Sequence, residues 1–223
     1  MSRPAVFSLV AVLALGMSPV DRLAGQAIQA VQATQAITLP APQTDGGRPL
    51  MQVLKTRHTS REFSTEQLPL QVLSNLLWAA FGVNREDGRR TAPSAVNWQE
   101  IDVYVCLQEG TYVYRAKENR LEPVVAADVR AATGGQAFAG TVPVDLVYVA
   151  DFAKTGKIPA EQRDIWSPAD AGFIAENVYL FCASEGLNVV VRGLIDKAAL
   201  AQKLQLRPDQ RIWLAQSIGY PKK

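Results

Sequence analysis

The sequence predicts an α+β sandwich, in which helices cover a β-sheet, and three observations support this class. Apolar residues alternate or run continuously in segments of strand length, and they recur at helical spacing in the segments between them. A hairpin-like pair of strands indicates antiparallel pairing. The chain has 223 residues, of which 48% are hydrophobic, enough to bury one substantial core, so a single domain is expected.

Strands are predicted in four parts of the chain. Residues 101–107 alternate in polarity, and the turn Gln108-Glu-Gly110 leads into residues 112–114, which together predict a β-hairpin. Residues 144–152 are almost continuously apolar, which is typical of a central strand buried on both faces. Further strands are predicted over residues 187–191 and 212–218.

The best-defined helix is predicted over residues 168–185. Ser167 is a favourable N-cap, Pro168 suits the first helical position, and Gly186 follows the last turn. Apolar side chains occupy nearly its whole circumference rather than one stripe. Such a helix is expected to be central or to lie at a subunit interface.

Three shorter helices are expected, with a fourth, weaker one. Pro69 suits the first turn of a helix that ends before Gly82. The weaker prediction is interrupted by the pair Gly134-Gly135. The short helices are predicted over residues 50–56, 69–81 and 197–204, and the weaker one over residues 126–138.

The N-terminal segments differ in composition from the rest. Residues 1–27 combine a positive start, a short apolar run and a small-x-small ending, which predicts a signal peptide and export to the periplasm. An uncleaved leader would leave the protein in the cytoplasm. The apolar run is too short for a transmembrane helix. Residues 28–47 resemble a low-complexity linker or an arm that wraps a neighbouring subunit, and the folded domain is predicted over residues 48–223.

Several functional classes are excluded by composition. The net charge is only +2 and the basic residues are scattered, so no nucleic-acid partner is expected. A single histidine and two distant cysteines, predicted to be buried free thiols, do not suit a metal site. Neither a nucleophile elbow nor a dinucleotide or phosphate-loop motif occurs. An enzyme built on this chain must therefore take its chemistry from a bound cofactor.

Two polar clusters are candidates for that role. The stretch "RHTSREF" places Arg57 and Arg61 four residues apart, so on a helix or its frayed end they share one face and offer forked donors to an anion. A solvated surface turn is the alternative. The second cluster, "RRTAPSAVNWQ" (residues 89–99), precedes a predicted strand and offers backbone and side-chain amides to a polar ring edge.

Together these residues resemble the FMN-dependent nitroreductase family, from about Arg48 to the end of the chain. The segment "LLWAAFGVNR" is similar to the subgroup that contains the thiazole/oxazole-forming peptide oxidases. The resemblance implies a nitroreductase-like three-layer sandwich with a central, mostly antiparallel sheet. It also implies a homodimer with the flavin at the interface.

The resemblance assigns FMN contacts to particular residues of this chain. "RHTSREF" resembles the phosphate and ribityl site of the family, "PSAVN" a loop beside the flavin, "GLNVVVRGLID" a backbone turn over the flavin ring, and "IGYPKK" a closing phosphate contact. Arg192 either stabilises the reduced flavin or forms a surface salt bridge. No catalytic acid or base is assigned. The implied contacts are Arg57, His58, Thr59, Arg61, Ser94, Asn97, Arg192, Gly193 and Lys222.

The function implied is that of an FMN-dependent oxidoreductase, which transfers hydride or electrons between the flavin and a small organic substrate. Two alternatives remain at this point. One is a protein that binds a flavin or another anionic ligand without turnover. The other is an enzyme of the same fold that consumes its flavin.

Overall fold

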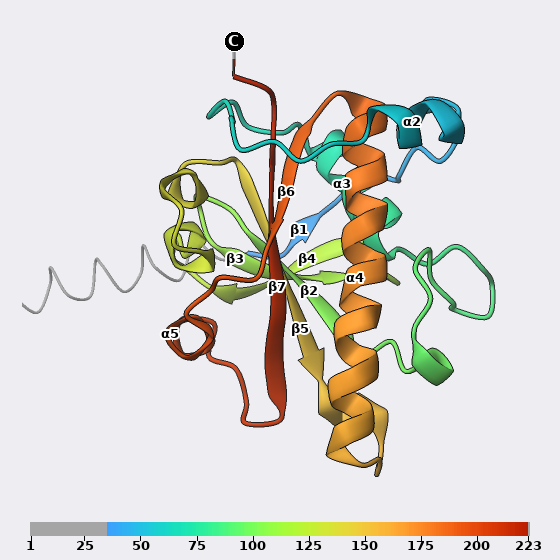
Figure 1. Cartoon of the computed structure of the whole chain (residues 1–223), viewed down its shortest axis with the longest axis vertical. Coiled ribbons are helices and arrows are strands. Elements are labelled where there is room, and N and C mark those ends of the chain that lie inside the picture. The colour runs from blue at the N-terminus through green and yellow to red at the C-terminus, as the bar shows by residue number, and fades with distance from the viewer. Residues whose placement is uncertain (1–34, 223) are drawn as a thin grey trace, which may run out of the picture. The chain divides into compact units, whose positions relative to one another are not determined.

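The computed structural model describes residues 35–222, which form one sheet with helices on both faces (Figure 1). The predicted signal peptide and the first residues of the predicted linker lie outside this range. The helices are α2 (Leu50–Thr56), α3 (Leu70–Phe81), α4 (Ala160–Glu185) and α5 (Lys197–Lys203). The strands are β1 (Ile37–Thr38), β2 (Ile101–Cys106), β3 (Thr111–Arg115), β4 (Arg120–Val125), β5 (Val144–Asp151), β6 (Asn188–Arg192) and β7 (Gln210–Gly219).

The sheet has seven strands in the order β1-β4-β3-β2-β5-β7-β6, and every pair of neighbours is antiparallel. Helices α3 and α4 pack against one face over the larger hydrophobic cluster. Helix α5 and short 3₁₀ turns cover the other face over a smaller cluster that includes Leu200 and Leu204. The predicted α+β, three-layer sandwich with a mostly antiparallel sheet is confirmed.

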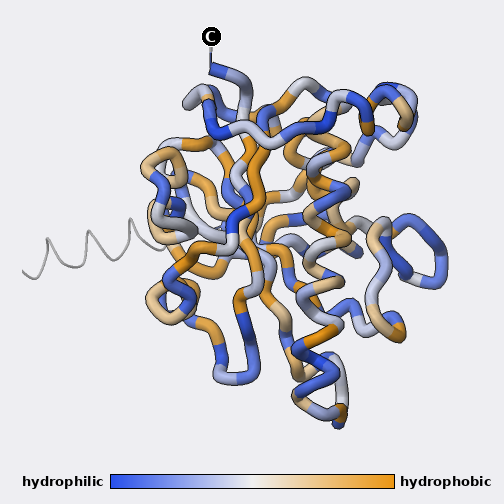
Figure 2. Tube along the Cα trace, viewed as in Figure 1, coloured by the Kyte–Doolittle hydropathy of each residue, from blue (hydrophilic) through white to orange (hydrophobic). Residues whose placement is uncertain are grey.

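The predicted central strand is confirmed as β5, whose eight residues are all buried. It lies between β2 and β7, so both of its edges are paired as well. Figure 2 shows hydrophobic residues along the central strands and a hydrophilic loop after α3. Cys106 and Cys182 are buried and unpaired, as expected.

The start of the long helix was predicted wrongly. Helix α4 begins at Ala160, after Pro159, and Pro168 lies inside it. Ser167 is completely buried rather than capping the helix. A Ser-Pro pair is typical of a helix start, but here tertiary packing carries the helix through the proline, which removes one backbone N–H donor from the helix.

The ordered structure begins before Arg48, which corrects the predicted boundary. Ile37 and Thr38 pair with β4. Leu39 is 4% exposed, and the hydroxyl of Ser74 on α3 donates to the carbonyl of Pro40 at 2.6 Å. The segment is rich in Gln and Ala, so its composition predicts a linker. Its few apolar residues nevertheless attach it to the sheet edge and to α3.

Two other regions differ from the sequence prediction. The weak helix over residues 126–138 is replaced by 3₁₀ turns at Arg130–Thr133 and Ala137–Gly140, separated by the glycine pair. The hairpin from β2 into β3 is confirmed, but β4 was not predicted, because Pro123 disfavours a strand. Among residues 35–222, no helix has the length and apolar character needed to cross a membrane.

Candidate functional site

The opening stretch, Arg57 to Phe63, lies where three segments of the chain meet. It follows α2, which ends at Thr56, and it is not helical, so the expected shared helical face of Arg57 and Arg61 is absent. The N–H of Ser60 donates to the carbonyl of Val189 on β6 at 3.0 Å. Phe63 pairs with Pro221 in an antiparallel bridge. The stretch therefore connects the outer edge of β6 with the C-terminal segment that carries Lys222.

Tyr179 on α4 holds this region together. Its hydroxyl accepts the N–H of Val191 at 2.9 Å and lies 3.1 Å from the hydroxyl of Thr59. The guanidinium of Arg57 lies over the Tyr179 ring, 5.3 Å from its centre. The sequence does not indicate a role for Tyr179, because a tyrosine on a helix gives no sign of the two distant segments that it contacts.

Within residues 35–222, the basic groups of this region are not paired with acidic side chains. Arg57, Arg61 and Lys222 form no ion pair with any residue between 35 and 222. His58 and Arg61 are exposed. The Nδ1 of His58 lies 2.9 Å from the carbonyl oxygen of Thr56, and because a carbonyl only accepts, Nδ1 is assigned as the donor. We call the side chains of Arg57, His58, Thr59, Arg61 and Lys222 the cationic cluster.

The second predicted cluster forms a tight loop at residues 93–99. The backbone N–H of Gln99 donates to Oγ of Ser94 at 3.0 Å, and the side-chain Nε2 of Gln99 donates to Oδ1 of Asn97 at 3.1 Å. Val96, Asn97 and Gln99 have positive φ values of 48°, 58° and 50°. A β-branched residue in this region is strained by about 1–3 kcal/mol, and such strain is concentrated at functional sites.

A pair of buried carboxyl groups lies beneath this loop. The N–H of Ala95 donates to Oδ2 of Asp170 on α4 at 2.9 Å, and this bond ties the loop to the helix. Glu100 is 0% exposed, and burial raises its pKa to about 7. Burial also raises the pKa of Asp170. The neutral form of Glu100 is therefore substantially populated at neutral pH. Neither carboxyl was identified from the sequence.

The two clusters lie apart on the same helix. Tyr179 and Asp170 are nine residues apart on α4, which corresponds to about 14 Å along the helix axis. In the described part of the chain, no hydrogen bond or ion pair joins residues 57–61 to residues 93–99. One chain therefore does not bring Ser94 and Asn97 to the cationic cluster.

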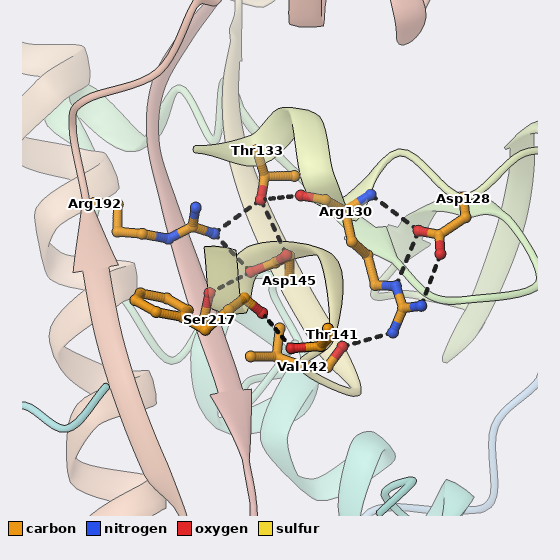
Figure 3. Close-up of polar contacts among 9 residues, drawn as sticks. Asp128, Arg130, Thr133, Thr141, Val142, Asp145, Arg192 and Ser217 are labelled. Atoms are coloured by element: carbon orange, nitrogen blue, oxygen red, sulfur yellow. Dashed lines mark hydrogen bonds and ion pairs between the residues drawn. The ribbon is translucent and has the colours of Figure 1, made fainter. Parts of the chain in front are cut away.

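The side chain of Arg192 points toward Asp145 and Thr133, so a buried ion pair replaces the surface salt bridge considered for it (Figure 3). Its Nη2 donates to Oδ1 of Asp145 at 2.6 Å and to the hydroxyl of Thr133 at 2.8 Å. The side chains of Arg192 and Asp145 are 3% and 0% exposed, so the ion pair is buried rather than at the surface. Burial raises the pKa of Asp145, and the positive charge of Arg192 limits the rise, so that the pKa is about 6. The carboxylate is therefore mostly ionised at neutral pH.

The comparisons with known proteins identify the family. Residues 54–220 match the model of the Nitroreductase family. The chain belongs to the nitroreductase family. A Methanocaldococcus jannaschii protein assigned to the nitroreductases is 29% identical over 168 residues, which cover 71% of this chain and 85% of that protein.

Solved structures of nitroreductase-like proteins share the fold. One from Ralstonia eutropha is 46% identical, with a TM-score of 0.82, and the match covers 86% of this chain and 91% of that one. A chain of the Escherichia coli microcin synthetase complex, at 19% identity and a TM-score of 0.65, matches over 92% of this chain and 95% of its own length. Family membership supports an oxidoreductase, and nitroreductases generally use flavin cofactors.

This nitroreductase also contains a cavity of about 490 Å³ that the sequence did not indicate. It lies between residues 43–50, α3 and α4, and Trp78, Asn177 and Phe181 contribute to its wall. None of the predicted FMN contacts lines it. The cavity is therefore separate from the cationic cluster.

Proposed function

We propose that the protein is an FMN-dependent oxidoreductase that transfers hydride or electrons between a bound flavin and a small organic substrate. The observation that carries the proposal is the cationic cluster, which has no acidic partner in the described chain and borders the outer edge of β6. A bound flavin supplies the redox chemistry, so the protein has to hold the cofactor and the substrate in place.

The residues of the cluster suit the phosphate end of FMN. Arg57, Arg61 and Lys222 supply positive charge, and guanidinium groups donate paired hydrogen bonds to phosphate oxygens. The hydroxyl of Thr59 and the Nε2 of His58 add polar contacts for the phosphate or ribityl groups. Arg57, Arg61 and Lys222 fit the phosphate because they are cationic and form no ion pair with any residue between 35 and 222.

The end of β6 suits the ring of the flavin. Along this outer edge, the carbonyl of Val189 is bound by Ser60 and the N–H of Val191 by Tyr179. By the alternation of a strand, the next outward-facing N–H belongs to Gly193. It is exposed and makes no hydrogen bond to the described residues. Gly193 therefore presents a backbone donor, whereas the charge of Arg192 remains inside the protein, paired with Asp145.

A homodimer with the flavin at its interface accounts for the second cluster. The loop that carries Ser94 and Asn97 is tied to α4 at Asp170, about 14 Å along the helix axis from Tyr179, which contacts Thr59, and we infer that it acts on the flavin of the other subunit. Support comes from large apolar side chains exposed on the outer faces of α4 and α2. Trp166 and Phe173 are 50% and 47% exposed, and Leu50 and Leu54 are 61% and 48% exposed. Such an apolar surface is typical of an interaction site.

Within the family, we place the protein near the thiazole/oxazole-forming peptide oxidases. The support is the resemblance of residues 76–85 to that subgroup. This placement concerns the substrate class and is separate from the proposal that FMN is bound.

The test is flavin binding by the purified protein, followed by the variant Arg61→Ala. A charged hydrogen bond to phosphate contributes about 1.5–3 kcal/mol, so we expect Arg61→Ala to weaken FMN binding by about tenfold or more. The matched control is Arg115→Ala, because Arg115 is also exposed but lies at the end of β3. Turnover of a quinone or a nitro compound then distinguishes an enzyme from a flavin carrier.

Two results would contradict the proposal. One is a folded protein that neither carries a flavin nor binds added FMN. The other is an FMN affinity of Arg61→Ala equal to that of the wild type and of Arg115→Ala, which would make the opening stretch a surface turn.

A further inference from the structure

Tyr179 lies on α4 and contacts two side chains of the cationic cluster, the hydroxyl of Thr59 and the guanidinium of Arg57. It is 6% exposed, and its hydroxyl reaches two segments that are far from α4 in sequence. The two contacts are the N–H of Val191, at 2.9 Å, and the hydroxyl of Thr59, at 3.1 Å. No other polar group among residues 35–222 contacts the hydroxyl of Tyr179.

The direction of these hydrogen bonds follows from what each group can donate. The N–H of Val191 is a donor only, so the phenol oxygen accepts from it. The buried O–H of Tyr179 needs an acceptor, and the oxygen of Thr59 is the acceptor within reach. On this ground we assign Tyr179 as the donor of the bond between the two hydroxyls.

This direction leaves the hydroxyl proton of Thr59 without an acceptor among residues 35–222. Thr59 is exposed, and its oxygen has no other hydrogen-bond partner among the described residues. The hydroxyl of Thr59 is thus oriented outward as a donor, and a chain of aligned hydrogen bonds strengthens each member. Its natural partner is a group that only accepts hydrogen bonds.

The surroundings identify that partner as an anion. The ring of Tyr179 also supports the guanidinium of Arg57 at 5.3 Å, a distance typical of a cation–π contact. Arg61 lies two residues beyond Thr59 and has no acidic partner within 35–222. Cationic groups around an outward hydroxyl donor match the oxygens of a phosphate.

We propose that Tyr179 is a positioning residue that orients Thr59 as a hydrogen-bond donor to the phosphate of FMN. The inference rests on the proposed function, since it assigns a task within the same site. A role limited to packing α4 against β6 is the alternative. The two roles differ in one measurable respect, because only the first depends on the phosphate of the ligand.

The experiment compares FMN with riboflavin, which lacks the phosphate, in titrations of flavin-free protein. The variant Tyr179→Phe keeps the ring beneath Arg57 and removes only the hydroxyl. We expect it to bind FMN about three- to tenfold more weakly and riboflavin with nearly unchanged affinity. In a Thr59→Val background, the same change should cause no further loss, because the donor is already absent.

Tyr114→Phe is the matched control. Tyr114 is also buried, and its hydroxyl contacts Asn119 at 3.2 Å, away from the cluster. It should leave both flavin affinities unchanged. Thermal unfolding without ligand reports any loss of stability common to the two variants.

The outcomes separate this inference from the proposed function. A wild-type protein that binds neither flavin overturns both. If the wild type binds FMN, then the inference alone is overturned by a Tyr179→Phe affinity equal to that of the wild type, by equal losses for FMN and riboflavin, or by losses that add in the double variant.

Discussion

Replacing Glu100 by glutamine should change how the stability of the protein depends on pH. Glu100 is completely buried beneath the loop at residues 93–99, near Asp170 of α4. Its carboxyl oxygens have no hydrogen-bond partner with good geometry in the described chain. Burial therefore raises its pKa from 4.5 to about 7. Glutamine has nearly the same shape and cannot ionise, so the variant removes only the titration.

The sign and size of the effect follow from proton linkage. The folded protein holds the Glu100 proton more tightly than the unfolded chain does. Its contribution is thus fully present below about pH 4.5 and is lost as the pH rises through about 7. A shift of the pKa from 4.5 to about 7 corresponds to about 3 kcal/mol. Asp145 also has a raised pKa, but both proteins contain it, so its contribution cancels. Asp170 interacts with Glu100, so the comparison reports the titration of the Glu100–Asp170 pair.

The assay is urea unfolding of wild type and Glu100→Gln at several pH values. Between about pH 4.5 and about pH 8, we expect the wild type to lose about 3 kcal/mol more stability than the variant. Glu118→Gln, a change at an exposed glutamate in the turn before β4, should behave as the wild type. Stability curves of wild type and Glu100→Gln that stay parallel over this range would refute the buried-acid explanation.

Two further predictions concern the buried ion pair and the dimer. A Cβ atom at Gly134 would lie 2.0 Å from Nη1 of Arg192, whereas nothing lies within 4 Å of one at Gly135. Gly134→Ala should therefore lower the free energy of unfolding by about 2–4 kcal/mol, and Gly135→Ala should change it little. Urea unfolding measures both. Equal effects of the two substitutions would contradict the packing of Gly134 against Arg192. Light scattering at micromolar concentration should show a dimer for the wild type and a monomer for Phe173→Glu, and a monomeric wild type would exclude the proposed interface.

Local sequence patterns predicted much of the sheet and of the short helices. The continuous apolar run of β5 and the alternation of β2 reflect burial on two faces, which depends on neighbouring residues and is visible in the sequence. The pattern around Ser167 and Pro168 gave a wrong helix start, because it too reports only the local sequence. It is locally a helix start, but packing of Ser167 in the core extends the helix through it.

The motifs also indicated which residue types gather at the candidate site, because the basic and hydroxyl groups of Arg57 to Arg61 are close in sequence. Their chemistry can be read without a structure. So can the proximity of Ser94 and Asn97 within one loop. What these motifs do not contain is the direction of each side chain, and Arg192 shows the consequence. The sequence suggested a flavin contact or a surface salt bridge for it, and its ion-pair partner, Asp145, lies 47 positions away in the core.

The sequence by itself determined the class of fold, the family and the composition of the cationic cluster, because each depends on residue identity and short-range spacing. Tertiary structure alone decided which groups are held in place and which are free to meet a ligand. Thr59 and Tyr179 are 120 residues apart, yet their hydroxyls are in contact. The ionisation of Glu100 likewise depends on burial against α4. Such contacts arise only when distant segments pack together, since burial and hydrogen-bond partners are properties of the folded chain.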